Sequence, residues 1–166
     1  DLDVVLSIVP SEVASIEAVG VPVLTTRIDI ANARLRFANG CIANLTASRI
    51  SRDRVRKIRF FQPAAYVSID YAAQKLERWT IEAGSGTKPS IQGGDVPVTP
   101  GEPLQRELAD FVDAVAAKRA PTVTGEQGRR ALELAQQITD RMTVELMPRR
   151  PDDTPRRRDD TKGSLG

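Results

Sequence analysis

Apolar and polar residues alternate along much of the first half of this chain. Such a period of two predicts β-strands, because successive side chains of a strand point to opposite faces. In residues 30–38, for example, the alternation places Ala33, Leu35 and Phe37 on one face. The segments with this pattern, and therefore the predicted strands, are residues 12–20, 30–38, 41–50, 55–61, 65–72 and 75–82.

Turn-forming residues separate these segments. Asn39-Gly40 predicts a two-residue hairpin with a type I′ turn, because both residues tolerate a positive φ. Gln62-Pro63 predicts a second turn. Residues 83–103 are rich in Gly, Pro, Ser and Thr and predict a surface loop, with a short edge strand around Val96 and Val98.

Helical spacing of apolar residues marks both ends of the body. Residues 2–9 indicate the end of a helix stopped by Pro10, and residues 103–118 predict an amphipathic helix. Thr124 and the glutamine three residues later form a capping box, which opens a helix running to about Met147. Its expected buried stripe consists of Ala131, Leu134, Ala135, Ile138 and Met142.

A run of strands followed by helices indicates an α+β fold. We expect an open, mostly antiparallel sheet of about six or more strands, with the helices packed on one face. The other face carries arginines and small polar residues, so it must meet solvent, another subunit or another domain.

The composition changes at Pro148. Residues 148–166 hold six of the 24 basic residues and four of the 22 acidic ones, so the net charge of +2 lies there and the rest is neutral. With three prolines and one large apolar side chain, this stretch cannot repay the entropy of ordering. We therefore expect one domain over residues 1–147 and a disordered charged tail over residues 148–166.

The residue inventory excludes several kinds of chemistry. The sequence contains no His, so it has no imidazole-based triad or zinc site, and no carboxylate cluster suggests a metal. The single cysteine, Cys41, excludes an internal disulfide and fits a reducing compartment, and we expect a cytoplasmic protein. No stretch approaches the roughly 20 apolar residues that span a membrane. The glycines after residue 83 lack the context of a phosphate-binding loop.

The most suggestive polar cluster follows the strand at residues 41–50. Arginine forks suit phosphate or carboxylate groups, so a substrate site is one interpretation, and a solvated edge or subunit contact is the other. The scarcity of aromatic residues, 4%, argues against nucleic-acid binding. The cluster consists of Ser48, Arg49, Arg52, Arg54, Arg56, Lys57 and Arg59.

Together these stretches resemble the C-terminal domain of the Gfo/Idh/MocA oxidoreductases. The resemblance covers residues 1 to about 145. The residues that carry it are DLDVVLSIV at 1–9, DIANARLRFANGCIANLTASRIS at 29–51, RKIRFFQPAAYVSIDYAAQKLE at 56–77 and PTVTGEQGRRALELAQQI at 121–138.

The resemblance implies an intact enzyme that uses NAD or NADP, bound by an N-terminal Rossmann domain that this sequence lacks. The family's catalytic His commonly precedes the position that matches Asp1, so we expect no catalytic residue within the chain. The chain is then a fragment, cut upstream, that is inactive and binds no cofactor by itself. Its partners are expected to be its own Rossmann domain and further copies of itself, through the open sheet face.

The stretch from Val21 to Tyr71 looks most like family members that act on UDP-N-acetylhexosamines. This implies hydride transfer at a ring hydroxyl of a nucleotide sugar such as UDP-N-acetylglucosamine, with Ser48, Arg49 and Arg54 binding the substrate. An inositol- or glucose-type substrate stays open. The alternative is a non-catalytic binding or assembly module that dimerises through its open sheet face.

Overall fold

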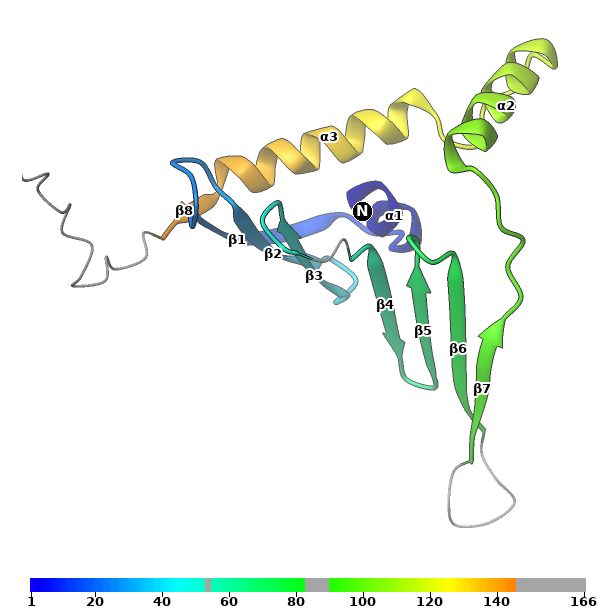
Figure 1. Ribbon diagram of the computed structural model, residues 1–166, viewed down its shortest axis with the longest axis horizontal. Helices are drawn as coiled ribbons and strands as arrows, with labels where there is room; N and C mark the ends of the chain where they lie inside the picture. The colour runs from blue at the N-terminus through cyan, green and yellow to red at the C-terminus, as the bar shows by residue number, and fades with distance from the viewer. Residues whose placement is uncertain (53–54, 83–89, 146–166) are drawn as a thin grey trace, which may run out of the picture. The chain divides into compact units, whose positions relative to one another are not determined.

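The computed structural model describes residues 1–52, 55–82 and 90–145. These residues form two compact units, Asp1–Ile50 with the stretch from Ala131 onward (the first unit) and Ser51–Arg130 (the second unit). The elements, labelled in Figure 1, are α1 (Leu2–Ile8), β1 (Val13–Val21), β2 (Ile30–Phe37), β3 (Ile42–Ser48), β4 (Lys57–Gln62), β5 (Ala65–Asp70), β6 (Lys75–Glu82), β7 (Ser90–Val96), α2 (Pro103–Ala116), α3 (Gly125–Asp140) and β8 (Met142–Val144).

The first unit is built on a four-stranded sheet in the order β3-β2-β1-β8. The prediction that Ala33, Leu35 and Phe37 share one face of β2 is confirmed, because all three are buried. Leu35 and Phe37 are at most 1% exposed. Val5 of α1 and Leu134 and Ile138 of α3 are buried as well. The first unit therefore has a hydrophobic core between one sheet face and two helices.

The turn between β2 and β3 differs from the predicted two-residue type I′ turn. Phe37 N–H donates to the Cys41 carbonyl at 2.9 Å, which leaves three residues in the loop. Gly40 has a φ of +87°, whereas Asn39 does not adopt a positive φ. A three-residue loop of this kind needs a left-handed residue only at its last position, which Gly40 supplies.

The end of α3 is the second correction. The helix stops at Asp140 instead of continuing to Met147, and Met142 lies in β8, which pairs parallel to β1. Gly20 allows this approach, since a Cβ there would meet the Met142 sulfur at 2.5 Å. A three-residue strand directly after a helix carries no period-two signal, so the sequence pattern extended the helix through it.

The second unit contains a separate antiparallel sheet in the order β4-β5-β6-β7. Its register places Ile58, Ile69, Leu76 and Val96 in one cross-strand row, and Phe61, Tyr66 and Trp79 in another on the opposite face. The edge strand expected around Val96 and Val98 lies earlier in the chain: it is the seven-residue β7, which ends at Val96 and pairs with β6 over its whole length, whereas Val98 lies in the segment after it.

The apolar stripe predicted for α2 is present but uncovered. Its N-cap is Glu102, whose carboxylate accepts from Gln105 N–H at 2.7 Å, and Ala114 is its one buried residue. Five large side chains are each more than half exposed: Leu104, Leu108, Phe111, Val112 and Val115. The predicted capping box of α3 is confirmed, because Thr124 and Gln127 exchange backbone and side-chain hydrogen bonds.

The α+β class and the mostly antiparallel strands are confirmed, with the strands divided between two four-stranded sheets. The charged tail predicted for residues 148–166, and with it the boundary at residue 147, lies outside the described residues.

Candidate functional site

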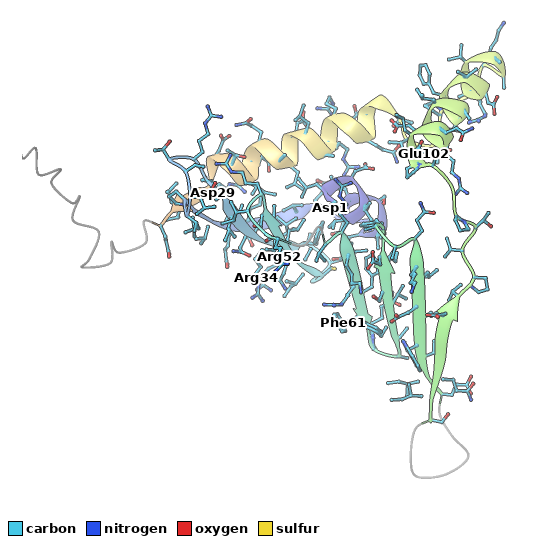
Figure 2. The ribbon with its side chains drawn as sticks, in the orientation of Figure 1. Asp1, Asp29, Arg34, Arg52, Phe61 and Glu102 are labelled. Atoms are coloured by element: carbon cyan, nitrogen blue, oxygen red, sulfur yellow. The ribbon has the colours of Figure 1, made fainter. Side chains whose placement is uncertain are left out.

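A buried carboxylate organises the loop between β1 and β2. The Asp29 side chain has no exposed surface, and its Oδ2 accepts the backbone N–H groups of Val23, Leu24 and Thr25 at 2.8, 2.7 and 2.9 Å. Its Oδ1 accepts the Thr25 hydroxyl at 3.0 Å and the Arg49 Nε at 2.7 Å. One side chain therefore satisfies three backbone donors and an arginine. Figure 2 labels Asp29.

These hydrogen bonds keep Asp29 ionised. Burial by itself raises the pKa of a carboxyl group, but the backbone N–H groups of Thr25, Val23 and Leu24, and then the Arg49 guanidinium, hold the pKa of Asp29 well below its usual range. Asp29 is thus an anion over the physiological pH range, and its charge is balanced from within the first unit.

Arg49, a predicted substrate-binding residue, is one of these partners. Besides the bond to Asp29, its Nη2 donates to the Thr25 hydroxyl at 2.5 Å and its backbone N–H donates to the Asp29 carbonyl at 3.1 Å. Its side chain is 46% exposed. Arg49 therefore joins the start of β2 to the end of β3 whatever else it binds.

The other predicted site residues are placed differently. Ser48 ends β3, and its hydroxyl accepts the Ile50 N–H at 3.4 Å. Arg54 lies outside the described residues. Asp1 is the exposed N-cap of α1, where its carbonyl accepts the Val5 N–H at 3.0 Å and its side chain makes no capping bond. A binding role for Ser48, Arg49 and Arg54 stays a prediction.

The remaining cations of the predicted cluster belong to the second unit. Lys57 forms an ion pair with Asp70 at 3.6 Å between β4 and β5. The hydrogen bond from the Ala73 N–H and, to a smaller extent, the charge of Lys57 lower the pKa of Asp70. Arg59 lies on the sheet opposite Ser68. Arg52 and Arg56 are exposed. The cluster is therefore divided between the two units along the chain.

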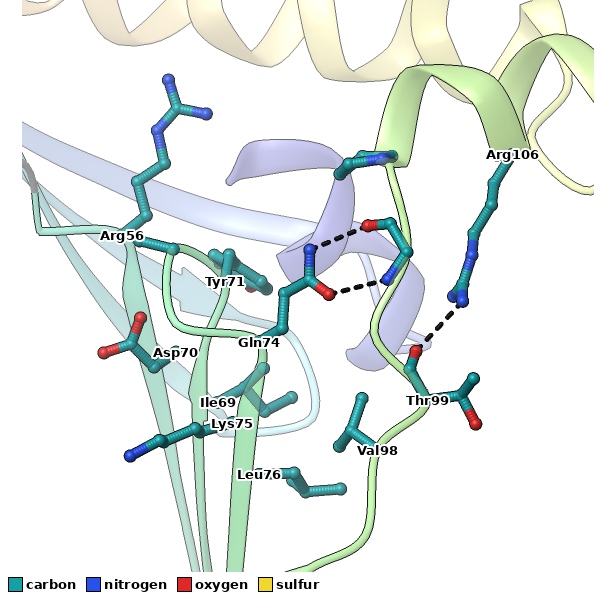
Figure 3. A pocket seen from close by; sticks show the side chains of 13 residues that line it. Arg56, Ile69, Asp70, Tyr71, Gln74, Lys75, Leu76, Val98, Thr99 and Arg106 are labelled. Carbon is teal, nitrogen blue, oxygen red and sulfur yellow. Dashed lines mark hydrogen bonds between the residues drawn. The ribbon is translucent and has the colours of Figure 1, made fainter.

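The second unit holds a cavity of about 900 Å³, shown in Figure 3. It lies between the β5–β6 turn, the segment before α2 and the first turn of that helix. Gln74 joins two of these walls, because its side-chain amide donates to the Gly101 carbonyl at 2.8 Å and accepts the Gly101 N–H at 2.9 Å. Arg106 donates from Nη2 to the carbonyls of Thr99 and Pro100, each at 3.0 Å.

Tyr71, which the sequence analysis did not single out as a site residue, lines this cavity. Its hydroxyl is buried and has no hydrogen-bond partner within the described part of the chain. Burial raises the pKa of Tyr71, so the hydroxyl stays protonated at neutral pH and able to donate. Sequence could not have revealed this site, because Gln74 and Gly101 are 27 residues apart.

Two kinds of site are not found in the described ranges. Among residues 1–52, 55–82 and 90–145, no three His, Cys, Asp or Glu side chains gather as metal ligands. Over the same residues, no helix is both long and apolar enough to cross a membrane. Nor do these residues form a strand–glycine loop–helix unit that would fit a dinucleotide.

The comparisons with known proteins point to one group of enzymes. No family model matches the chain. Over 153 residues the chain is 36% identical to UDP-N-acetylglucosamine 3-dehydrogenase of Acidithiobacillus ferrooxidans. The alignment covers 90% of this chain and 48% of that protein. The chain thus spans about half the length of this relative.

The solved structures agree. A structure of the Acidithiobacillus ferrooxidans enzyme superposes with a TM-score of 0.76 at 32% identity, over 86% of this chain and 44% of that one. Aldose-aldose oxidoreductase from Caulobacter crescentus has a TM-score of 0.64 at 21% identity, over 84% and 42% of the two chains. Levoglucosan dehydrogenase in complex with NADH has a TM-score of 0.68 at 15% identity, over 84% and 45%. The chain therefore has the sequence and the fold of the C-terminal domain of the Gfo/Idh/MocA oxidoreductases.

Proposed function

We propose that this chain is the substrate-side domain of an NAD(P)-dependent sugar oxidoreductase that acts on a nucleotide sugar such as UDP-N-acetylglucosamine. The observation that carries the proposal is the 36% identity to UDP-N-acetylglucosamine 3-dehydrogenase over 90% of this chain. In the proposed reaction a ring hydroxyl becomes a ketone, its carbon gives a hydride to the nicotinamide, and the hydroxyl proton goes to a base.

The cofactor, NAD or NADP, would be bound by a Rossmann domain and not by this chain. The match to about half the length of UDP-N-acetylglucosamine 3-dehydrogenase leaves room for such a domain in the intact protein. The base would be the His that the family carries before the position of Asp1. The chain alone is then inactive. The free thiol of Cys41 fits an enzyme that works in the reducing cytoplasm.

Ser48, Arg49 and Arg54 remain the proposed substrate-binding residues. The Arg49 side chain is about half exposed, which supports a second role beside its bond to Asp29. Arginine suits this role because its planar fork matches two phosphate oxygens at once.

Homo-oligomerisation through the sheet of the second unit is also proposed. Phe61, next to Tyr66 with a ring-centroid distance of 5.1 Å, is 79% exposed, and Ile91 is 69% exposed. Exposed apolar surface of this kind marks an interaction site. If the sheet face joins subunits, Phe61→Lys should shift the protein toward monomer in light scattering, whereas Arg78→Gln should not. A wild-type protein that is monomeric at all concentrations would contradict this.

The activity is tested with the polypeptide encoded by the complete reading frame, supplied with NAD or NADP. We expect reduced cofactor to form with UDP-N-acetylglucosamine and not with free N-acetylglucosamine. The 166-residue chain alone should form none. An intact protein that reduces no cofactor with any sugar or nucleotide sugar would leave the assembly module as the better account, since the exposed apolar faces fit that function as well.

A further inference from the structure

The cavity of the second unit has walls that are held in place without a ligand. The paired hydrogen bonds between Gln74 and Gly101 join the β5–β6 turn to the segment before α2, and Arg106 ties that segment to the helix. Ligand sites are typically preformed in this way, and the cavity volume of about 900 Å³ is that of a site for a ligand of nucleotide size.

The floor of the cavity is apolar. Ile69 and Leu76 are directly opposite each other on β5 and β6, and Val98 comes from the segment after β7. Such a floor suits the flat or apolar part of a ligand and supplies most of the buried area on binding.

The rim is cationic. Arg56, Lys75 and Arg106 line the cavity against a single lining acid, Asp70, which is already paired with Lys57 at 3.6 Å. Neither Arg56 nor Lys75 makes a side-chain hydrogen bond or ion pair to another described residue, and both are exposed. Within the described residues, these two positive charges have no ion-pair partner, since the Asp70 carboxylate that lies across from Lys75 is paired with Lys57. Phosphate oxygens are suitable partners for both.

We infer that this cavity binds a phosphate-bearing ligand of nucleotide size, with Arg56 and Lys75 at the phosphates and the Ile69, Leu76 and Val98 floor beneath the apolar part. The Tyr71 hydroxyl, which lacks a partner, is a further donor to this ligand. The choice of a nucleotide sugar as the ligand rests on the proposed function, whereas the cavity and its charge do not.

Calorimetric titration of the 166-residue chain at low salt tests this inference, with UDP-N-acetylglucosamine, UDP, NADH and inorganic phosphate as separate probes. We expect the two uridine compounds to bind. Arg56→Gln and Lys75→Gln should each weaken UDP binding about tenfold, the loss of one charge-assisted contact. Arg78→Gln is the matched control, because Arg78 lies on β6 but does not line the cavity, and it should leave binding unchanged.

Salt and Tyr71→Phe give independent readouts. Raising the ionic strength from about 0.01 M to about 0.15 M, where the Debye length falls from about 30 to about 8 Å, should weaken UDP binding to wild type more than to Arg56→Gln. Tyr71→Phe should weaken UDP binding a few-fold while leaving the ligand-free chain at least as stable, because it removes an unsatisfied hydroxyl.

Three results would overturn the inference: no binding of UDP, equal binding by all variants, or binding of inorganic phosphate that is as tight as that of UDP. Binding of NADH as tight as that of UDP would overturn the choice of a uridine nucleotide as the ligand. The proposed function fails separately. If the intact enzyme does not oxidise UDP-N-acetylglucosamine while UDP binding still depends on Arg56, the cavity assignment stands. If it oxidises that sugar with the same KM in wild type and Arg56→Gln, the cavity assignment falls and the function stands.

Discussion

The two units of this chain differ in how they use apolar residues. In the first unit, Leu35 and Phe37 are at most 1% exposed, and Val5 of α1 and Leu134 and Ile138 of α3 are buried as well. In the second unit, Phe61 is 79% exposed and Phe111 is 58% exposed, and among its described residues Ala114 is the one apolar residue that is buried. Burial of apolar area is the main source of folding stability. The first unit therefore has its own core, whereas the second has surfaces suited to being covered by a ligand or another protein surface.

The largest expected effect on stability comes from comparing a buried leucine of the first unit with an exposed leucine of the second. Leu35→Ala should destabilise the protein by about 2–5 kcal/mol, because it leaves a cavity in a closed core. Leu108→Ala, at a site that is 56% exposed, is the matched control and should cost less than about 0.5 kcal/mol. Both are measured by denaturant unfolding. Equal losses of unfolding free energy in the two variants would mean that α2 is covered in solution, which would contradict the difference between the two units.

A smaller effect should come from the ion pair of the first unit. Asp29→Asn replaces an acceptor of three backbone N–H groups by an amide, so the loop between β1 and β2 should lose stability. The folded pKa of Asp29 lies below the unfolded value near 3.8, so its contribution is full above that pH and is lost as the pH falls through the folded pKa. The gap in melting temperature between wild type and variant should be constant above pH 4 and narrow below it. A gap that is unchanged in acid would contradict the role of the charge.

Arg49 and Arg54 test whether binding and structure can be separated. In the intact enzyme, both Arg49→Ala and Arg54→Ala should raise the KM for a charged sugar substrate. Arg49→Ala should also lower the melting temperature, because it breaks the bonds to Asp29 and Thr25. A stability loss for Arg49→Ala with an unchanged KM would assign it to structure alone.

The smallest effect is expected for deletion of residues 148–166. Their composition predicts no core, so the melting temperature should stay almost the same. A large drop in a thermal scan would show that this stretch is packed against the rest.

The sequence predicted what depends on local periodicity, and missed what depends on contacts between distant segments. Six strands follow from alternation, and the start of α3 follows from the Thr124 cap. The short β8 could not be predicted, because it forms by pairing with the edge of β1 at Gly20, which is distant in the sequence. The division into two sheets likewise depends on which strands pair with each other, and the alternation of apolar and polar residues does not predict strand pairing.

The same contrast holds for the candidate sites. The arginine cluster can be recognised in the sequence because its members are close together along the chain. Asp29, which binds Arg49, is 20 residues away and could not be recognised as its partner. The cavity was missed because its walls are joined by Gln74 and Gly101, and its orphan hydroxyl is recognisable only from burial. Charge along the sequence therefore led to the hypothesis of a phosphate or carboxylate ligand but did not locate the cavity.

The most direct test of the central claim follows the hydride itself. UDP-N-acetylglucosamine carrying deuterium on the ring carbons would be incubated with the intact enzyme and NAD or NADP, and sugar and cofactor would be examined by mass spectrometry. The account predicts that one deuterium leaves the sugar ring and appears in the reduced nicotinamide, with none transferred by the 166-residue chain alone. Retention of all deuterium by the sugar in the presence of the intact, folded protein would contradict it.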